Sequence, residues 1–267
     1  MKEYLTLQEI QARMLEIIKD IAKFAIENNL KFVLTGGSAL GAVRHQGFIP
    51  WDDDADLALP REQYEFFLAN YQPKIKDVEL LWHTTDREWN YPYARIADTL
   101  TAPEIIYAQV KNGIFVDVFP IDHMSDNKFM QKVEYYQLKT IDILRNMVRK
   151  QHWNPNEPGL KIKKLIAPIA KLKSVGFYAK LMNAKAYQIN KKHQSSKTAG
   201  LLTVIGVNGM REFGVAKWYT STIWVPFCDT KLPIVKQYDA YLTKMYGDYL
   251  QEPPVESRKH HWNIYRL

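Results

Sequence analysis

The first hydrophobic pattern of the chain recurs at helical spacing and predicts an amphipathic helix over residues 6–29. Thr6 begins this segment and Glu9 follows three positions later, which is the spacing of a capping box. No chemically reactive group interrupts the apolar face, so we expect this helix to cover one side of a sheet. That face contains Ile10, Met14, Ile17, Ile18, Ile21, Phe24 and Ala25.

Short runs of hydrophobic and β-branched residues predict strands and further helices after residue 29. The predicted strands cover residues 31–34, 54–59, 78–81, 115–119, 201–205 and 224–227, with helices over residues 61–71 and 234–246. Gly247 follows the last helix, where a glycine is typical of a helix stop. This mixture of strands and helices indicates an α+β fold.

Four aspartates, Asp52, Asp53, Asp54 and Asp56, lie at the start of the strand predicted over residues 54–59. Carboxylates this close together repel one another unless a positive charge lies among them. Alternate side chains of a strand share one face, so we expect Asp54 and Asp56 to project together, with Asp52 beside them and Asp53 turned away. Because Mg²⁺ binds to one or two carboxylates and to phosphate oxygens, the cluster predicts a metal-dependent enzyme that acts on a phosphate compound.

A glycine-rich turn, Gly36-Gly37-Ser38, connects the strand at residues 31–34 to a predicted helix over residues 39–44. Glycines let the backbone approach a ligand, and the free N–H groups at a helix start suit a phosphate. An ordinary strand-to-helix turn is the alternative interpretation. The aspartates that follow favour a phosphate site.

Asp117 is the single carboxylate of the hydrophobic strand predicted over residues 115–119. Burial of this carboxylate is costly unless it is paired or bound to a metal. A hydrogen-bonded structural aspartate is therefore the alternative to a site residue. Asp122 follows Pro120, and we expect it in a turn or at a helix cap.

The composition limits which kinds of protein the chain can be. A chain of 267 residues with 46% hydrophobic content can bury a substantial core, as one large domain or as a domain with an insert. The single cysteine, Cys228, excludes an intrachain disulfide and a cysteine-based zinc cluster. The first residues lack the apolar core of a signal peptide and no apolar run is long enough to span a bilayer, so we expect a cytoplasmic protein.

Residues 128–197 are strongly basic and have a helical pattern that is interrupted near residues 154–159. They contain sixteen Lys or Arg and three acidic residues, so their net charge is +13 and that of the rest of the chain is −6. A basic amphipathic helix pair suits anionic lipid headgroups, while a solvated face over a helical subdomain is the alternative. Nucleic acid is disfavoured because no nucleic-acid-binding signature accompanies the charge.

The motifs resemble a known group of enzymes. Gly-Gly-Ser followed by Asp-x-Asp is similar to the nucleotidyltransferase superfamily, and the string from Gly41 to Asp56 resembles the LicD family. These phosphocholine transferases decorate bacterial teichoic acids and lipopolysaccharides, and fukutin-type transferases share the signature. Further matches lie at residues 115–122 and at residues 246–249, followed by Pro253-Pro254, Arg258 and His260-His261.

The resemblance implies a nucleotidyltransferase-like mixed sheet flanked by helices, with a basic helical insert. We expect the catalytic core at residues 1–124, the insert at residues 125–199, and a C-terminal part at residues 200–267 that completes the active-site cleft. Arg258 and either His260 or His261 then become candidates for binding the donor or the acceptor.

The resemblance also implies an activity, the transfer of phosphocholine from CDP-choline to a glycan hydroxyl with release of CMP. Asp117 would be the general base, beside one or two Mg²⁺ ions, with Mn²⁺ as the alternative cation. The implied metal ligands are Asp52, Asp54, Asp56 and Asp117, of which the last three are the catalytic residues. The implied phosphate-binding residues are Gly36, Gly37, Ser38, Arg44 and Arg95.

A quaternary ammonium offers no hydrogen-bond donors, so its recognition requires aromatic faces. Trp82, Trp89, Tyr91 and Tyr93 are candidates for a choline cage, and plain core packing is the alternative for each. The acceptor in this family is a lipid-linked glycan, which implies a position at the inner face of the bacterial membrane.

Two rival functions remain open. One is transfer of another group, such as ribitol phosphate or phosphoethanolamine, or true nucleotidyl transfer. The other is a catalytically idle scaffold, which is disfavoured because an idle protein has no reason to keep the unpaired charges of Asp54, Asp56 and Asp117.

Overall fold

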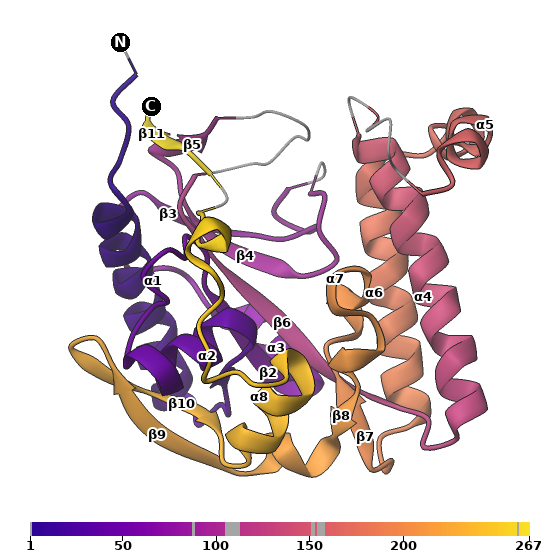
Figure 1. The fold of residues 1–267 in the computed structure, drawn as a ribbon. Coiled ribbons are helices and arrows are strands. Elements are labelled where there is room, and N and C mark those ends of the chain that lie inside the picture. The colour runs from indigo at the N-terminus through magenta and orange to yellow at the C-terminus, as the bar shows by residue number, and fades with distance from the viewer. Residues whose placement is uncertain (1, 87–88, 105–112, 151–152, 154–157, 261) are drawn as a thin grey trace.

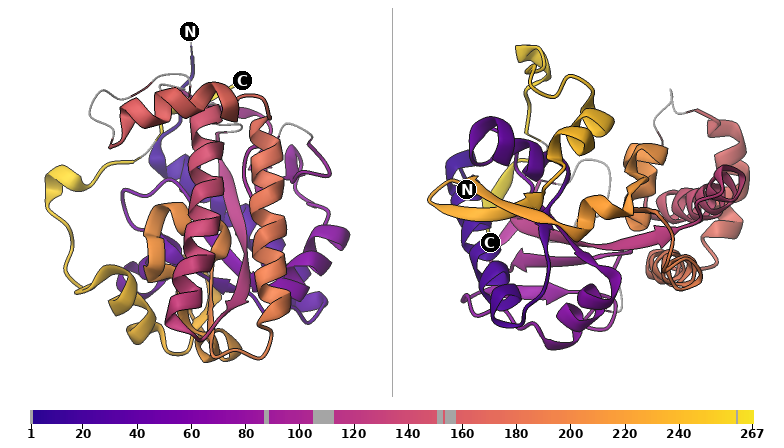
Figure 2. Two further views of the ribbon diagram at one scale, coloured as in Figure 1. Left: turned by 90° about the vertical axis from the view of Figure 1, so that its right-hand side faces the viewer. Right: turned by 90° about the horizontal axis from the view of Figure 1, so that it is seen from below.

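The protein has the α+β fold that the sequence predicts, with one curled mixed sheet at its centre (Figure 1). A computed structural model describes residues 2–86, 89–104, 113–150, 153, 158–260 and 262–267. Helices cover the sheet, and a separate helical layer stands beside its far end (Figure 2).

The main path of the sheet has the order β1-β2-β6-β4-β3, and β2 and β6 are parallel whereas the other neighbours on this path are antiparallel. Two short strands continue the sheet, because β7 pairs with the end of β6 and β8 pairs with β7. The strands are β1 (Val33–Leu34), β2 (Asp56–Pro60), β3 (Val78–Leu81), β4 (Ala94–Asp98), β6 (Phe115–Met124), β7 (Thr198–Gly200) and β8 (Gly214–Val215).

Helix α1 (Leu7–Glu27) confirms the first predicted helix and its cap. The Thr6 side chain accepts a hydrogen bond from the Glu9 backbone, and the Glu9 carboxylate accepts one from the Thr6 backbone. The predicted apolar face packs into the main hydrophobic core, with Met14 and Ile17 fully buried. Helices α2 (Gly36–His45) and α3 (Arg61–Asn70) follow β1 and β2 directly.

The basic segment forms three helices, α4 (Lys128–Arg149), α5 (Leu160–Ala170) and α6 (Val175–Lys192). Helices α4 and α6 pack side by side and α6 also packs on β6 (Figure 2, left). They enclose a second, smaller apolar core that includes Leu138, Met182 and Ile189. Residues 154–157, where we expected a helix interruption, lie outside the described residues, whereas Gly159 directly precedes α5 in the left-handed region.

The C-terminal part differs from the prediction in two places. The strand expected at residues 201–205 is wrong, because η1 (Leu202–Val204) and α7 (Ile205–Asn208) are helical. Leu202 and Ile205 are buried in the second core, and a short buried apolar run does not distinguish strand from helix. The helix expected from residue 234 begins only at Tyr238, because Ile234 still belongs to a strand.

The remaining elements complete the C-terminal half. A hairpin of β9 (Thr222–Phe227) and β10 (Thr230–Val235) leads to α8 (Tyr238–Tyr246), which ends at Gly247 as predicted. The last strand, β11 (Ile264–Arg266), pairs with β5 (Thr101–Pro103). The other short helices are η2 (Gly209–Glu212), η3 (Ala216–Thr220) and η4 (Val255–Ser257). Within the described ranges, no helix has the length and apolar character needed to cross a bilayer.

Asp122 corrects another prediction. It lies inside β6 rather than in a turn, and it is fully buried. Its two carboxylate oxygens accept hydrogen bonds from Arg61 Nε and Nη2 at 2.7 and 2.6 Å. This ion pair is what allows the charge to stay in the core.

Candidate active site

The register of the sheet brings three sequence-predicted residues together. Asp56 on β2 is the Cα partner of Asp117 on β6, and Asp117 is in turn the partner of Arg95 on β4. These residues are far apart in sequence and lie side by side on three adjacent strands.

Asp117 forms a buried, two-point ion pair with Arg95. Arg95 Nε and Nη2 donate to the two carboxylate oxygens at 2.7 and 3.0 Å, and Arg95 is 3% exposed. The guanidinium carbon also lies 3.4 Å from the ring centroid of Phe115 and 4.5 Å from that of Tyr91. Arg95 Nη1 is buried and finds no hydrogen-bond partner in the described part of the chain.

Burial raises the pKa of Asp117, while the Arg95 guanidinium opposes this effect and the Asp54 carboxylate adds to it. Tyr93 hydrogen-bonds to the Asp117 carboxylate and also lowers its pKa. Asp117 is therefore held in position by two neighbours, and it is close enough to Asp54 to sense its charge.

The pKa of the Asp56 carboxyl is strongly raised. Burial raises its pKa well above the ordinary value, and the carboxylates of Asp54, Asp117 and Asp52 raise it further. Strand β2 begins at Asp56, so Asp54 precedes the strand instead of opening it as we predicted. Asp53 is buried and accepts a hydrogen bond from the Trp262 backbone at 2.7 Å, which anchors the C-terminal segment.

The glycines of the predicted phosphate turn lie against these aspartates. A Cβ atom on Gly36 would be 3.0 Å from Asp56 Oδ2, and one on Gly37 would be 3.0 Å from Asp52 Oδ2. Gly36 also has a φ of +56°, which favours glycine. Ser38 accepts a hydrogen bond from the Asp56 backbone N–H at 2.9 Å. The start of α2 thus packs closely against the carboxylates of Asp56 and Asp52. The helix begins at Gly36, three residues earlier than predicted.

The arrangement of these residues bears on whether they can hold a divalent cation. In the described ranges, no three acidic, histidine or cysteine side chains are placed to hold a metal ion together. One reason is that both oxygens of Asp117 are bonded to Arg95. The donor chemistry nonetheless fits a hard cation, because Asp52 and Asp54 raise the pKa of Asp56 and a bound divalent ion would remove this repulsion.

Arg44 lies at the opposite end of α2 from Gly36, about 12 Å away along a helix of this rise. Its guanidinium donates to the backbone oxygen of Tyr249 at 3.0 Å and lies 6.0 Å from the Trp51 ring. These contacts tie α2 to the C-terminal segment. A phosphate contact for Arg44 stays a prediction.

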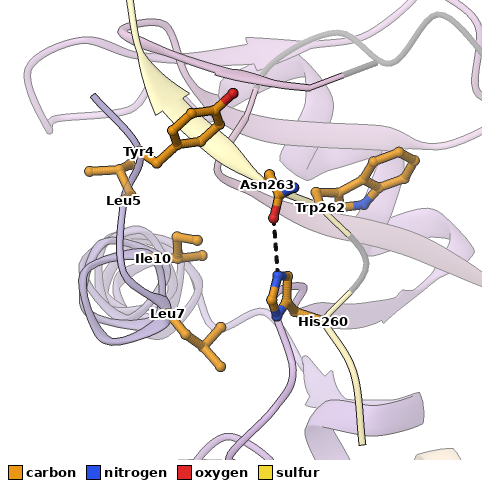
Figure 3. Close-up of a pocket in the computed structure, with 7 residues that line it drawn as sticks. All are labelled: Tyr4, Leu5, Leu7, Ile10, His260, Trp262 and Asn263. Carbon is orange, nitrogen blue, oxygen red and sulfur yellow. Dashed lines mark hydrogen bonds between the residues drawn. The ribbon is translucent and has the colours of Figure 1, made fainter. Parts of the chain in front are cut away.

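Of the C-terminal candidates, Arg258 lies beside this contact and His260 lies in a separate pocket. Arg258 lies 4.9 Å from the centroid of Trp51 and pairs with Glu252 at 2.9 Å. His260 hydrogen-bonds to Asn263 in a pocket between the two ends of the chain, lined also by Tyr4 and Ile10 (Figure 3). His261 is outside the described residues.

The four aromatic candidates do not form one group. The rings of Trp89, Tyr91 and Tyr93 follow one another at centroid distances of 5.2 and 5.4 Å, whereas Trp82 packs on Tyr64 and His83. Trp82, Trp89 and Tyr91 are part of the buried core, and only Tyr93 is half-buried. The role of these rings toward choline is still a prediction.

Two residues near the site were not found from the sequence. The Tyr241 hydroxyl hydrogen-bonds to Thr35 Oγ1 and accepts from the Gly36 N–H at 2.9 Å, so it orders the start of α2. Glu212 is 3% exposed, its Oε2 has no partner within the described chain, and burial raises its pKa to about 7. Its charge also acts on Asp56. Tyr241 and Glu212 lie outside the recognised motifs, and no local pattern marks either of them.

Comparisons with known proteins match the part of the chain that forms this site. The LicD/FKTN/FKRP nucleotidyltransferase domain family matches residues 29–157, which contain β2, β4 and β6. The lipopolysaccharide cholinephosphotransferase LicD of Haemophilus influenzae is 26% identical over 263 residues, which is 96% of each chain. An uncharacterized protein of Rickettsia prowazekii is 28% identical over 148 residues, covering 51% of this chain and 53% of its own. An uncharacterized protein of Rickettsia typhi is 34% identical over 77 residues, covering 29% of this chain and 25% of its own.

The family match spans the strands that carry Asp56, Arg95 and Asp117, and the similarity to the Haemophilus protein extends over nearly the whole chain, including the basic helices. Both findings confirm the resemblance that the glycine and aspartate motifs indicated. The chain contains a match to the LicD/FKTN/FKRP nucleotidyltransferase domain at residues 29–157, and over 96% of its length it is similar to the Haemophilus LicD protein.

Proposed function

We propose that this protein transfers phosphocholine from CDP-choline to a hydroxyl group of a cell-surface glycan precursor of the lipopolysaccharide or teichoic-acid type. The observation that carries the proposal is the alignment of Asp56, Asp117 and Arg95 across three strands in a chain similar along its whole length to a cholinephosphotransferase. An idle scaffold would gain nothing from carboxylates that raise the pKa of the buried Asp56.

Asp54 and Asp56, with Asp52 beside them, are the residues that would hold Mg²⁺ in this proposal. When bound, Mg²⁺ would neutralise the donor diphosphate and stabilise the departing CMP. The backbone at the start of α2 would bind the donor phosphate, because Gly36 and Gly37 leave room there and a helix start carries partial positive charge.

Asp117 is the proposed general base. The acceptor oxygen forms a bond to the phosphorus that carries choline, the bond from that phosphorus to the oxygen of CMP breaks, and the hydroxyl proton moves to Asp117. Burial raises the pKa of Asp117 and thus its affinity for that proton. Arg95 positions the carboxylate through two hydrogen bonds.

The test combines purified protein, Mg²⁺, choline-labelled CDP-choline and lipopolysaccharide lacking phosphocholine. We expect CMP and labelled glycan in equal amounts, and neither product in the presence of a chelator. A matched control is Asp229→Asn, which removes an exposed carboxylate that pairs with Lys19 on the surface and should leave the rate unchanged. If CMP forms from CDP-ribitol or CDP-ethanolamine and not from CDP-choline, the enzyme transfers another head group. Release of pyrophosphate would instead indicate nucleotidyl transfer.

A further inference from the structure

Helix α5 carries its large apolar side chains on the outside. Ile162, Leu165 and Ile169 are 65%, 78% and 69% exposed, and they follow one another at helical spacing on a single face. The opposite face, which contains the buried Ala167 and Ala170, has the small residues. In a helix that only covers a core this arrangement is reversed, with the large apolar side chains inside.

The exposed stripe extends beyond the helix. Ile166 completes the face at 36% exposure, and Leu172, two residues after the end of α5, is 80% exposed. Single exposed apolar residues are common on protein surfaces, but a contiguous group of this kind marks a contact site.

The segment that carries this stripe has only basic charges. Residues 158–192 contain nine lysines and no acidic residue. The lysines nearest in sequence to the stripe are Lys161, Lys163, Lys164, Lys171 and Lys173. A partner that covers the stripe therefore needs both an apolar interior and negative charge at its surface.

The position of α5 connects this surface to the active site. It lies across the end of α4 (Figure 2, left), and the Tyr178 hydroxyl fixes it by donating to the Ala170 backbone oxygen at 3.1 Å. Arg145 and Arg149 at the same end of α4 lie 6.0 and 5.8 Å from the Tyr91 ring, which Arg95 contacts from the site. Helix α4 thus contacts both α5 and the ring that packs on Arg95.

We propose that the α5 surface, defined as Ile162, Leu165, Ile166, Ile169 and Leu172 with the flanking lysines, docks on an anionic lipid bilayer. The apolar side chains would enter the boundary between headgroups and acyl chains, and the lysines would contact lipid phosphates. A second copy of the chain is a poorer occupant, because it would place one lysine-rich surface against another. A nucleic acid would match the lysines and leave the apolar stripe exposed.

The test is co-sedimentation of the full chain with vesicles of phosphatidylcholine, with and without phosphatidylglycerol. Wild type is expected to bind the anionic vesicles, with binding that weakens as salt increases. The double variant Leu165→Ser/Ile169→Ser should bind roughly tenfold more weakly or worse, since both side chains leave the acyl boundary. Each of Lys161→Gln, Lys164→Gln and Lys171→Gln should reduce binding to anionic vesicles about fivefold.

The matched control removes exposed apolar side chains from the same helical insert but outside α5. Phe129→Ser/Tyr136→Ser changes residues of α4 that are 72% and 64% exposed, and it should bind like wild type. Circular dichroism melting checks that each variant is folded. The proposal is overturned if wild type does not bind anionic vesicles, or if the α4 and α5 variants lose binding equally. It is also overturned if light scattering shows a wild-type dimer that Leu165→Ser/Ile169→Ser converts to a monomer.

Discussion

Strand β6 contains two buried aspartates, Asp122 and Asp117, and each pairs with a buried arginine. The two pairs differ in the number of hydrogen bonds that the arginine makes. Arg61 binds both oxygens of Asp122 and uses its remaining Nη1 on Glu65 at 3.0 Å and Asn183 at 2.8 Å. Arg95 binds both oxygens of Asp117 in the same way, but its Nη1 has no partner in the described part of the chain.

The charged groups near the two aspartates also differ. Asp117 lies near the carboxylates of Asp54 and Asp56, whereas Glu65, the carboxylate that raises the pKa of Asp122, is itself bonded to Arg61. Burial of a charge therefore does not by itself indicate function. A buried ion pair beside carboxylates that raise one another's pKa indicates a place where a charged ligand completes the structure.

The largest effect is expected from Asp54→Asn/Asp56→Asn. Phosphocholine transfer should fall at least about 1,000-fold, because the site would lose the carboxylates proposed to hold the cation. Measurement of CMP release by chromatography gives the rate. A folded double variant with wild-type activity would show that catalysis does not require these carboxylates.

A smaller effect separates the two ion pairs. Arg95→Lys and Arg61→Lys both keep the charge and lose the two-point geometry. We expect Arg95→Lys to reduce the turnover number roughly 100-fold, while Arg61→Lys mainly lowers the free energy of unfolding, by about 2 kcal/mol. Steady-state kinetics and urea unfolding of both variants test this, and equal losses of turnover would show that the pairs do not differ in function.

Glu212 provides a test by pH. Its pKa of about 7 lies above that of an exposed glutamate, so the folded state keeps a proton that the unfolded state has lost. The contribution of Glu212 to stability is complete below about pH 4.5 and is lost as the pH rises through about 7.

Between pH 5 and pH 8, wild type should therefore lose roughly 2 kcal/mol of unfolding free energy that Glu212→Gln retains. Urea unfolding at both pH values measures the difference. Identical pH dependence in the two proteins would show that the Glu212 carboxylate has an ordinary pKa.

The smallest effect on the folded enzyme is expected from the α5 surface. Leu165→Ser/Ile169→Ser should change the free energy of unfolding by less than about 0.5 kcal/mol, because both side chains are exposed. Its transfer rate to a water-soluble acceptor fragment should match wild type. A large loss of stability would mean that these side chains pack against protein, and the α5 surface would not be available for docking.

Local signals allowed much of the fold and part of the site to be predicted. The Thr6 capping box, the period of α1 and the aspartate motif each lie within a few residues of sequence. The partners of Asp117, the role of Tyr241 and the burial of Glu212 depend on residues that are distant in sequence and meet only in the sheet. Asp122 was misassigned because a proline before an aspartate is typical of a turn, while its buried partner Arg61 lies 61 residues away.

The central claim is that the carboxylates of Asp54 and Asp56 form a divalent-cation site for an activated diphosphate. The most direct measurement is the melting temperature of chelator-treated protein with and without Mg²⁺ and CDP-choline. Wild type should melt at a higher temperature when both are added, whereas Asp54→Asn/Asp56→Asn should melt above metal-free wild type and not respond. An unchanged wild-type melting temperature, or an equal rise in the double variant, would contradict the claim.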